Sequence, residues 1–256
     1  VARTSTSSVM RQIFRRSVLK VQSLLLFLRS AESAECALNP SANFFFMISV
    51  KRLLIFIVGL YCMGLGVALS VIAALGTSPI SCLPYVVSEI LPVSVGTVTF
   101  IMNLLFMTAQ IAILRKDFRL WQFLQLPGLL VFSVCIDLNI LLFSWLPVDF
   151  YVLQVLWMLL GCLILGVGVG LLLLADYVMM PADYLIRILA SVVLKKDFGK
   201  VKVAFDVALV CIAAVTSLVF LHEIVGIREG SLIAALTVGI IARYVASKFS
   251  FLQIER

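Results

Sequence analysis

Charged residues are scarce in this chain. Asp, Glu, Lys and Arg together make up 13% of its 256 residues, whereas hydrophobic residues make up 63%. A soluble domain carries about 25% charged and about 45–50% apolar residues, so this chain has too few charges to coat a soluble globule. The composition instead predicts a membrane protein that crosses the bilayer several times, with about 20 apolar residues in each helical crossing.

Side chains that hold metals or perform catalysis are also few. The chain has one histidine, His222, and its six cysteines form neither a Cys-x-x-Cys pair nor a set with metal-ligand spacing. We find no Ser/His/Asp arrangement and no phosphate-binding loop. We therefore expect no enzyme activity, no metal and no cofactor. The net charge of +7 fits the cytoplasmic loops of a membrane protein better than it fits nucleic-acid binding.

Six long apolar runs predict six membrane-spanning helices. Helix is the required form, because hydrocarbon offers backbone groups no partner outside their own segment. The alternation of apolar and polar residues that is typical of outer-membrane barrels is absent. The predicted spans are residues 53–75, 97–114, 126–143, 151–175, 201–221 and 231–247.

Basic residues predict how these spans are oriented. Lys51 and Arg52 precede the first span, and a basic cluster at 187–202 lies between the fourth span and the fifth. The loops expected on the opposite side contain a single cation, Arg228. Because basic loops stay on the cytoplasmic side of the membrane, we predict that both termini are cytoplasmic.

Residues 1–46 fit the rest of the chain poorly. Several basic residues precede a short apolar run, 21–28, which is too short to span a bilayer and is closed by Arg29. A signal peptide is one interpretation, but the charges that follow the run do not fit a cleavage region. We favour an N-terminal extension that is not part of the native fold, with Met47 as the true start.

An internal repeat divides the remainder into two halves, 47–148 and 149–256. Glycines, prolines and one polar pair recur at a fixed offset, and backbone geometry sets where such residues are placed. Each half holds three spans, and an odd number of crossings turns the second half upside down. The sequence thus predicts two inverted three-helix repeats, an architecture typical of secondary transporters with a site between the halves. The pairs at an offset of 102 are Gly59/Gly161, Gly64/Gly166, Gly66/Gly168, Pro79/Pro181 and Gly128/Gly230, and those at 103 are Gly96/Gly199 and Asn103/Asp206.

Each half also carries a short insert after its first span. A break in the apolar run is followed by Pro79 in one half and by Pro181 in the other. Proline suits the first turn of a helix because the N–H that it lacks would have no helical partner there, and Ser78 is a suitable N-cap. Neither insert is long enough to span the bilayer. Two placements stay open, a re-entrant half-helix and an amphipathic helix in the interface.

Ionised side chains inside a span need an explanation, because each costs about 2.5–3.5 kcal/mol at the bilayer centre. Asp137 lies well inside the third span, and we interpret it as a functional group that binds a cation, a proton or a basic substrate. Asn103 and Asn139 are expected either to hydrogen-bond neighbouring helices or to line the same pocket. Asp206 and Arg243 are predicted to form a structural pair near the cytoplasmic side.

The inserts and the glycines complete the set of candidate residues. Asp183 and Arg187 stand four positions apart on the second insert and are predicted to pair. The predicted solute or ion contacts are Asp137, Asn103, Asn139, Thr77, Ser78, Asp183 and Asp206. Glycines at helical spacing are expected to let helices approach closely. These are Gly59, Gly64, Gly66, Gly161, Gly166, Gly168 and Gly170.

Several of these elements resemble a known family. Gly64-Leu-Gly-Val-Ala, Ala74-Leu-Gly-Thr-Ser-Pro-Ile and Val95-Gly-Thr, followed by Asn103 and Asp137, are similar to the YczE family of bacterial integral membrane proteins, which look like the YitT-type proteins. The chain departs from that family at its third span, which keeps only Gly128 of a glycine-rich start. The resemblance implies a multi-pass protein of the bacterial inner membrane and names no substrate.

Together these features predict an all-α membrane helix bundle that acts as a secondary transporter or permease for a small solute. Two alternatives stay open: a substrate-capture subunit of a multi-component transporter, and a membrane assembly factor that transports nothing. The expected partners are the lipid bilayer, a small-molecule solute, and either further copies of the chain or an energising partner.

Overall fold

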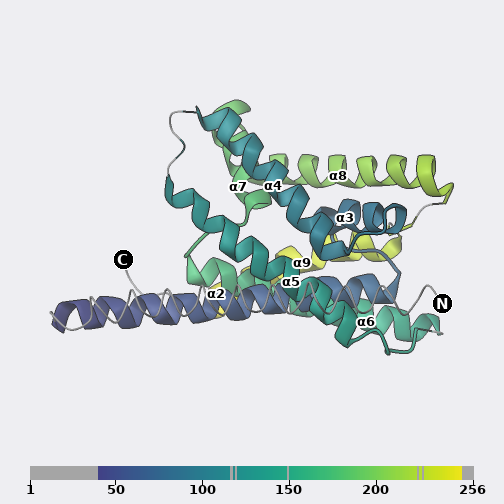
Figure 1. Ribbon diagram of the computed structural model, residues 1–256, viewed down its shortest axis with the longest axis horizontal. Coiled ribbons are helices and arrows are strands. Elements are labelled where there is room, and N and C mark those ends of the chain that lie inside the picture. Colours follow the sequence, from purple (N-terminus) through teal and green to yellow (C-terminus); the bar gives the residue numbers. More distant parts are fainter. Residues whose placement is uncertain are drawn as a thin grey trace. The chain divides into compact units, whose positions relative to one another are not determined.

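The computed structural model describes residues 40–249, apart from 116, 117, 119, 149, 224 and 227, and it is helical with no strand in that part of the chain (Figure 1). Residues 1–39, most of the predicted extension, lie outside the described residues. Residues 1–53 and 54–256 form two units, and the contacts below are those within 54–256. The long helices are α2 (Pro40–Ala73), α4 (Val95–Leu114), α5 (Gln125–Leu142), α6 (Tyr151–Ala175), α8 (Phe198–Leu221) and α9 (Glu229–Lys248), and the short ones are α3 (Pro79–Ile90) and α7 (Pro181–Ile188).

Five helices among the described residues are long and apolar enough to cross a membrane. They coincide with the first five predicted spans, at Val50–Ala73, Val95–Leu114, Gln122–Leu142, Tyr151–Ala175 and Phe198–Leu221. The protein is therefore an all-helical, multi-pass membrane protein. The 20-residue helix α9 occupies the place of the sixth predicted span. It is not among those five candidates. One of its apolar side chains, that of Leu232, lies outside the described part of the chain. The sixth crossing stays a prediction.

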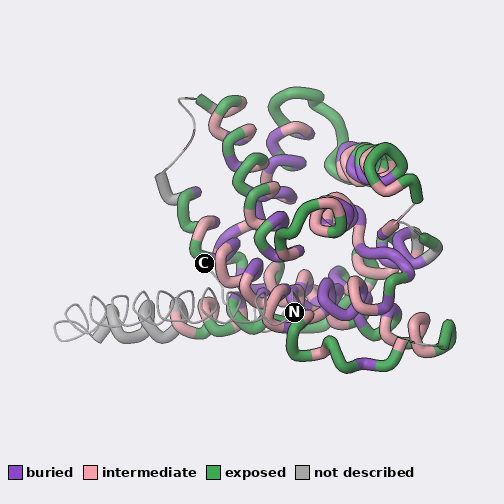
Figure 2. The backbone as a smooth tube through the Cα atoms, turned by 45° about the vertical axis from the view of Figure 1, so that its right-hand side comes forward, coloured by how far each residue is buried: buried purple, intermediate pink, exposed green. Residues whose placement is uncertain are grey.

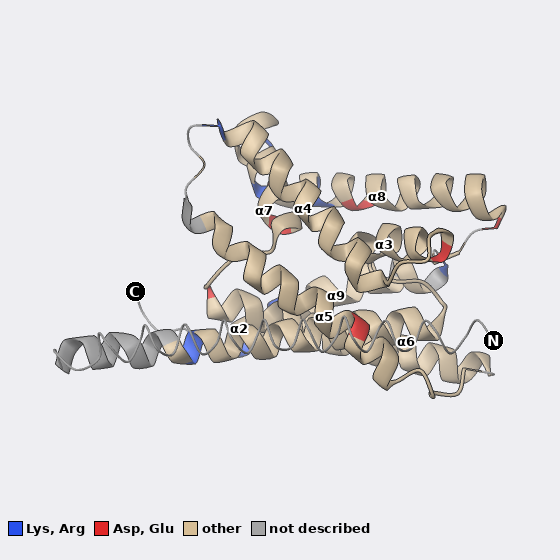
Figure 3. Ribbon diagram, viewed as in Figure 1, with Lys and Arg blue, Asp and Glu red and all other residues tan. Residues whose placement is uncertain are grey.

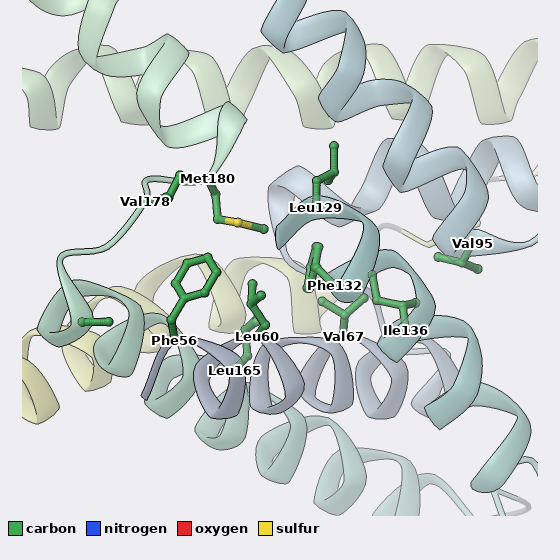
Figure 4. Packing of buried hydrophobic residues seen from close by; sticks show 11 residues of the cluster. Phe56, Leu60, Val67, Val95, Leu129, Phe132, Ile136, Leu165, Val178 and Met180 are labelled. Atoms are coloured by element: carbon green, nitrogen blue, oxygen red, sulfur yellow. The ribbon is translucent and has the colours of Figure 1, made fainter. Parts of the chain in front are cut away.

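Apolar side chains of α2 and α5 form the centre of the core. Phe56, Leu60 and Val67 of α2 lie opposite Phe132 and Ile136 of α5 in Figure 4. All five are at most 6% exposed, and in a bilayer their close packing, not removal from water, holds the two helices together. The opposite faces of the long helices are exposed, as the green segments of Figure 2 show, and carry large apolar side chains, as expected where lipid is the solvent.

The crossing of α2 and α6 depends on four glycines. A Cβ atom placed on Gly66 would lie 2.7 Å from the carbonyl oxygen of Gly161, and one on Gly168 would lie 2.9 Å from that of Gly59. These distances are shorter than real Cβ contacts, so the two backbones pack directly against each other. Higher numbers on α2 meet lower numbers on α6, so the two helices run antiparallel.

Further glycines let the third long helix of each half approach the first. Gly64 of α2 packs against Cys135 of α5, and Gly166 of α6 packs against Ile241 of α9. Gly170 continues the second contact, because a Cβ atom there would lie 2.7 Å from that of Val245. The predicted packing glycines therefore all lie where another helix comes close.

The two short helices pack on the second long helix of the opposite half. In the contacts of the described residues, α3 lies along α8, and α7 lies along α4. Each short helix begins with its proline at the first turn, Pro79 in α3 and Pro181 in α7. A π-helical turn, Leu189–Val193, follows α7. Two seams result, one between α3 and α8 and one between α4 and α7.

Candidate functional site

Asp137 binds the N-terminus of α4. Its Oδ2 accepts a hydrogen bond from the hydroxyl of Ser94 at 2.6 Å, and its Oδ1 accepts one from the backbone N–H of Gly96 at 2.8 Å. The first backbone N–H groups of a helix have no partner within the helix and carry partial positive charge, which a carboxylate neutralises. Asp137 thus satisfies the start of a neighbouring helix. A role in solute binding stays a prediction.

The same junction explains why Gly96 is glycine. A Cβ atom on Gly96 would lie 2.6 Å from the carboxylate carbon of Asp137. One turn earlier on α5, the hydroxyl of Ser133 donates to the carbonyl oxygen of Gly96 at 2.6 Å. The corresponding cap in the second half is local, because Asp197 accepts from the N–H of Gly199 just two residues on.

The two buried asparagines bond their own helices. Asn103 donates to the carbonyl oxygen of Thr99, and Asn139 donates to that of Cys135. Neither donation reaches a neighbouring helix, which differs from the predicted interhelical bond. Ser and Asn side chains readily find such a carbonyl one turn back in their own helix. The Oδ1 atom of Asn139 is buried and has no hydrogen-bond partner among the described residues.

Residues at the start of α3 form a sealed polar contact with the segment before α9. Thr77 is fully buried, and its backbone N–H donates to the carbonyl oxygen of Gly226 at 3.4 Å. Its hydroxyl donates to the sulfur of Cys82, which in turn lies 3.7 Å from the hydroxyl of Ser231. Ser78, the N-cap of α3, donates to the hydroxyl of Ser81 in the first turn. The contact leaves Thr77 no access to a solute in this conformation.

Asp183 and Asp206 share one lysine. The Nζ atom of Lys202 on α8 lies 3.3 Å from Oδ1 of Asp183 on α7 and 3.6 Å from Oδ2 of Asp206. Figure 3 shows charged residues of both signs gathered where α7 meets the start of α8. The side chains are between 21% and 37% exposed, so the cluster is partly shielded from water.

This cluster corrects both predicted ion pairs. Arg187 does not pair with Asp183, and its guanidinium instead donates to the sulfur of Met179 at 3.5 Å. Arg243 does not pair with Asp206, and it donates to the carbonyl oxygen of Gly239 on an exposed face. One ammonium between two carboxylates is attracted by both and separates two like charges, so Lys202 binds both acids in preference to either predicted arginine.

Buried glutamines line the seam between α4 and α7. Gln110 of α4 donates to the carbonyl oxygen of Pro181 at 2.8 Å, and Gln122 donates to the hydroxyl of Tyr184 at 2.5 Å. Gln125, at the start of α5, is also buried. Sequence reasoning overlooked these three residues and Lys202. Glutamines in or beside an apolar run could have indicated these positions. Burying an amide costs free energy unless it is hydrogen-bonded, so such a residue needs a partner on a neighbouring element.

The two seams differ in chemistry, although the sequence predicts that the halves repeat. Gln110 and Ala213 stand 103 positions apart, the offset of Asn103 and Asp206. Gln110 lies at the α4–α7 seam, whereas Ala213 packs with Cys82 and Val86 in an apolar cluster at the α3–α8 seam. No group of three or more His, Cys, Asp and Glu side chains that could hold a metal ion occurs in the described part of the chain.

A family model matches residues 50–247 and describes a family of unknown function, DUF6198. The chain belongs to this family. The matched segment includes all five candidate spans, both short helices and the α4–α7 seam, so the DUF6198 region is the helical bundle described above. Neither the curated proteins nor the solved structures give a match. The resemblance to YczE and YitT proteins stays a prediction.

Proposed function

We propose that this DUF6198 protein is a secondary carrier for a small solute in the bacterial inner membrane, built from two inverted three-helix repeats with α9 as the sixth crossing. One observation supports this proposal: a contact between two residues recurs between the two residues that stand 102 positions from them. Gly59 packs against Gly168 and Gly66 packs against Gly161. Moving each residue of the first pair to its counterpart in the other half produces the second pair.

A two-fold axis that relates the two halves would carry each of these contacts onto the other. Because α2 and α6 run antiparallel, an axis that exchanges them is perpendicular to both, and it lies in the membrane plane if they span the bilayer. Gly128 packs against Phe56, and its counterpart Gly230 packs against Met158, the residue 102 positions after Phe56. An in-plane axis is typical of carriers whose two halves alternate in opening toward either side.

The seams give the carrier its two gates. Each short helix packs on the opposite half, so a rocking motion of one half against the other opens one seam while it closes the other. The α3–α8 seam is apolar, and the contacts of Thr77 hold the start of α3 against the segment before α9. The α4–α7 seam contains buried amides and borders the Lys202 cluster, so we place the solute there.

Labelling of introduced cysteines tests this proposal. Gln110→Cys and Ala213→Cys report on the two seams, and both positions are fully buried in the structure. In right-side-out and inside-out vesicles, a membrane-impermeant maleimide should label Gln110→Cys from one side only and Ala213→Cys from the other, because each seam opens in turn. Mass spectrometry of peptides separates these sites from the native cysteines.

Lys200→Cys, at an exposed position at the start of α8, is the control that labels in every state. Its labelled side also tests the predicted cytoplasmic location of the loop between α7 and α8. If neither buried position is labelled from either side while Lys200→Cys is, the bundle is static and the carrier proposal is wrong.

An assembly factor without transport is the second candidate function. The observation that favours it is Asp137, whose two carboxylate oxygens are both occupied by the N-terminus of α4. A static scaffold needs such an anchor and does not need a seam that opens. The labelling experiment separates the two functions, because only the carrier exposes Ala213→Cys.

A further inference from the structure

A single ammonium group lies between two carboxylates where α7 meets α8. The Nζ atom of Lys202 lies 3.3 Å from Oδ1 of Asp183 on α7 and 3.6 Å from Oδ2 of Asp206, four positions further along α8. With all three side chains ionised, two negative charges and one positive charge give this cluster a net charge of −1. The cluster is therefore one positive charge short of neutrality.

The second oxygen of Asp206 shows which of the two acids bears the excess charge. Its Oδ1 atom is buried and has no hydrogen-bond partner among the described residues. Buried side-chain polar atoms nearly always have a partner, and a buried charge without one is far more costly than a neutral polar group. Asp183 is the more exposed acid, at 37% against 21%. A proton on Asp206 would remove the poorly solvated charge.

The surroundings of the cluster are apolar on one side and open on the other. Val201, which precedes Lys202, packs with Ile186 of α7 in a buried apolar cluster, and Phe205, which precedes Asp206, packs against that cluster. The three charged side chains are nevertheless 21–37% exposed. A proton can therefore pass between the cluster and water, although the buried oxygen has no water or protein donor of its own.

The charges that act on Asp206 are those of Lys202 and Asp183. Within the described part of the chain, α8 packs against α3, α7 and the π-helical turn that follows α7, and that turn carries no titratable side chain. The further titratable side chains on α8 and on the helices packed against it are Lys200 and Cys211 of α8, Tyr184 and Arg187 of α7, and Cys82, Tyr85 and Glu89 of α3.

We propose that Asp206 binds and releases a proton, and that Lys202 pairs with Asp183 alone while the proton is bound. The proton comes from water and adds to the carboxylate of Asp206, and no other covalent bond forms or breaks. The cluster then becomes neutral. A metal ion fits less well, because no group of three or more acidic, His or Cys side chains occurs among the described residues and the ammonium of Lys202 would repel it.

Proton binding changes how α7 is held. In the ionised cluster, Lys202 divides its attraction between its own helix and α7, whereas a neutral Asp206 leaves the ion pair across the two helices as the stronger one. The α4–α7 seam lies on the other side of α7. In the carrier proposed above, on which this role rests, the proton is thus the coupling ion for the opening of that seam.

Infrared spectra of the purified full chain test the proton site. The band of a neutral carboxyl group should disappear between about pH 6 and about pH 8, where ordinary exposed carboxyl groups stay ionised. This change should be lost in Asp206→Asn and kept in Asp206→Glu. Asp197→Asn, at the exposed N-cap of α8, is the matched control and should keep it. No change in the parent, or a change that Asp206→Asn retains in full, overturns the proposal.

Labelling of Gln110→Cys tests whether the proton acts on the seam. The maleimide labelling of this position, divided by that of Lys200→Cys, corrects for the dependence of thiol reactivity on pH. The ratio should change with pH while Asp206 is present and become independent of pH when Asp206→Asn is added. A ratio that responds to pH equally in both backgrounds overturns the coupling role of Asp206.

Two outcomes separate this inference from the carrier proposal. Proton release from Asp206 in a protein whose seams are never labelled supports the proton site and overturns the carrier alone. Labelling of both seams without any carboxyl band that depends on Asp206 supports the carrier and overturns the inference alone.

Discussion

Gly66→Ala should strongly destabilise the protein, although the same change in an exposed helix normally stabilises it. The new Cβ atom would lie 2.6 Å from the backbone nitrogen of Leu165 and 2.7 Å from the carbonyl oxygen of Gly161. Both neighbours are backbone atoms, which cannot rotate away as a side chain does. The helices α2 and α6 must separate, and we expect a loss above the roughly 0.5–3 kcal/mol of an ordinary substitution.

Thermal unfolding in detergent and the monodisperse yield measure this effect. Gly239→Ala is the matched control, because no atom lies within 4 Å of a Cβ atom placed there. Alanine is the better helix former by about 0.8–1.0 kcal/mol, so this variant should be at least as stable as the parent. Equal melting temperatures for the two variants would contradict the glycine crossing and, with it, the exchange of contacts that supports the carrier.

Asp137→Ala should lower the free energy of unfolding by about 2–4 kcal/mol, because it removes two hydrogen bonds to a charged acceptor at a helix N-terminus. The N–H of Gly96 loses its partner in a half-buried place, while the hydroxyl of Ser94 keeps its contact with the exposed hydroxyl of Thr97 at 2.7 Å. Asp137→Asn should cost less, since its amide oxygen still accepts from Gly96.

Asp197→Ala is the matched control for this second prediction. It removes the corresponding N-cap of α8, but there the cap is exposed and water replaces it, so the loss should be about 1 kcal/mol. Denaturant unfolding measures the loss in the free energy of unfolding for each variant. The amide of Gly96 should exchange its hydrogen more slowly in the parent than in Asp137→Ala, which would place the loss at the start of α4. If Asp137→Ala unfolds like the parent yet loses solute uptake, Asp137 is the solute-binding group that the sequence alone predicts.

Local chemistry explains why so much of the helical structure was predictable. A bilayer requires long apolar segments to be helical, and the five candidate spans coincide with predicted ones within a few residues. Pro79 and Pro181 start the two short helices where expected, because a missing N–H costs nothing in a first turn. The recurring glycines predict close packing, and a neighbouring helix lies close to each of them except Gly199.

Partners across helices were much less predictable. The sequence predicts a ligand-binding carboxylate at Asp137 because no residue near it along the chain offers a partner, whereas Ser94 and Gly96, which bond it, lie more than 40 positions away. Asp183 was assigned to Arg187 because helical spacing makes them neighbours, yet Lys202 on another helix lies closer. The spacing of residues along a helix shows which ion pairs can form. The packing of helices against each other determines which of them do form.

The amino-acid sequence by itself determined the membrane character, the helices and the recurring spacing of glycines and prolines, because each follows from local composition or from a count along the chain. Only the tertiary structure decided that Asp137 holds the start of α4, that Lys202 joins two acids and that two buried glutamines, Gln110 and Gln122, bond the start of α7. Those groups belong to different helices, and the angle and depth at which the helices pack determine which polar atoms meet and which stay unsatisfied.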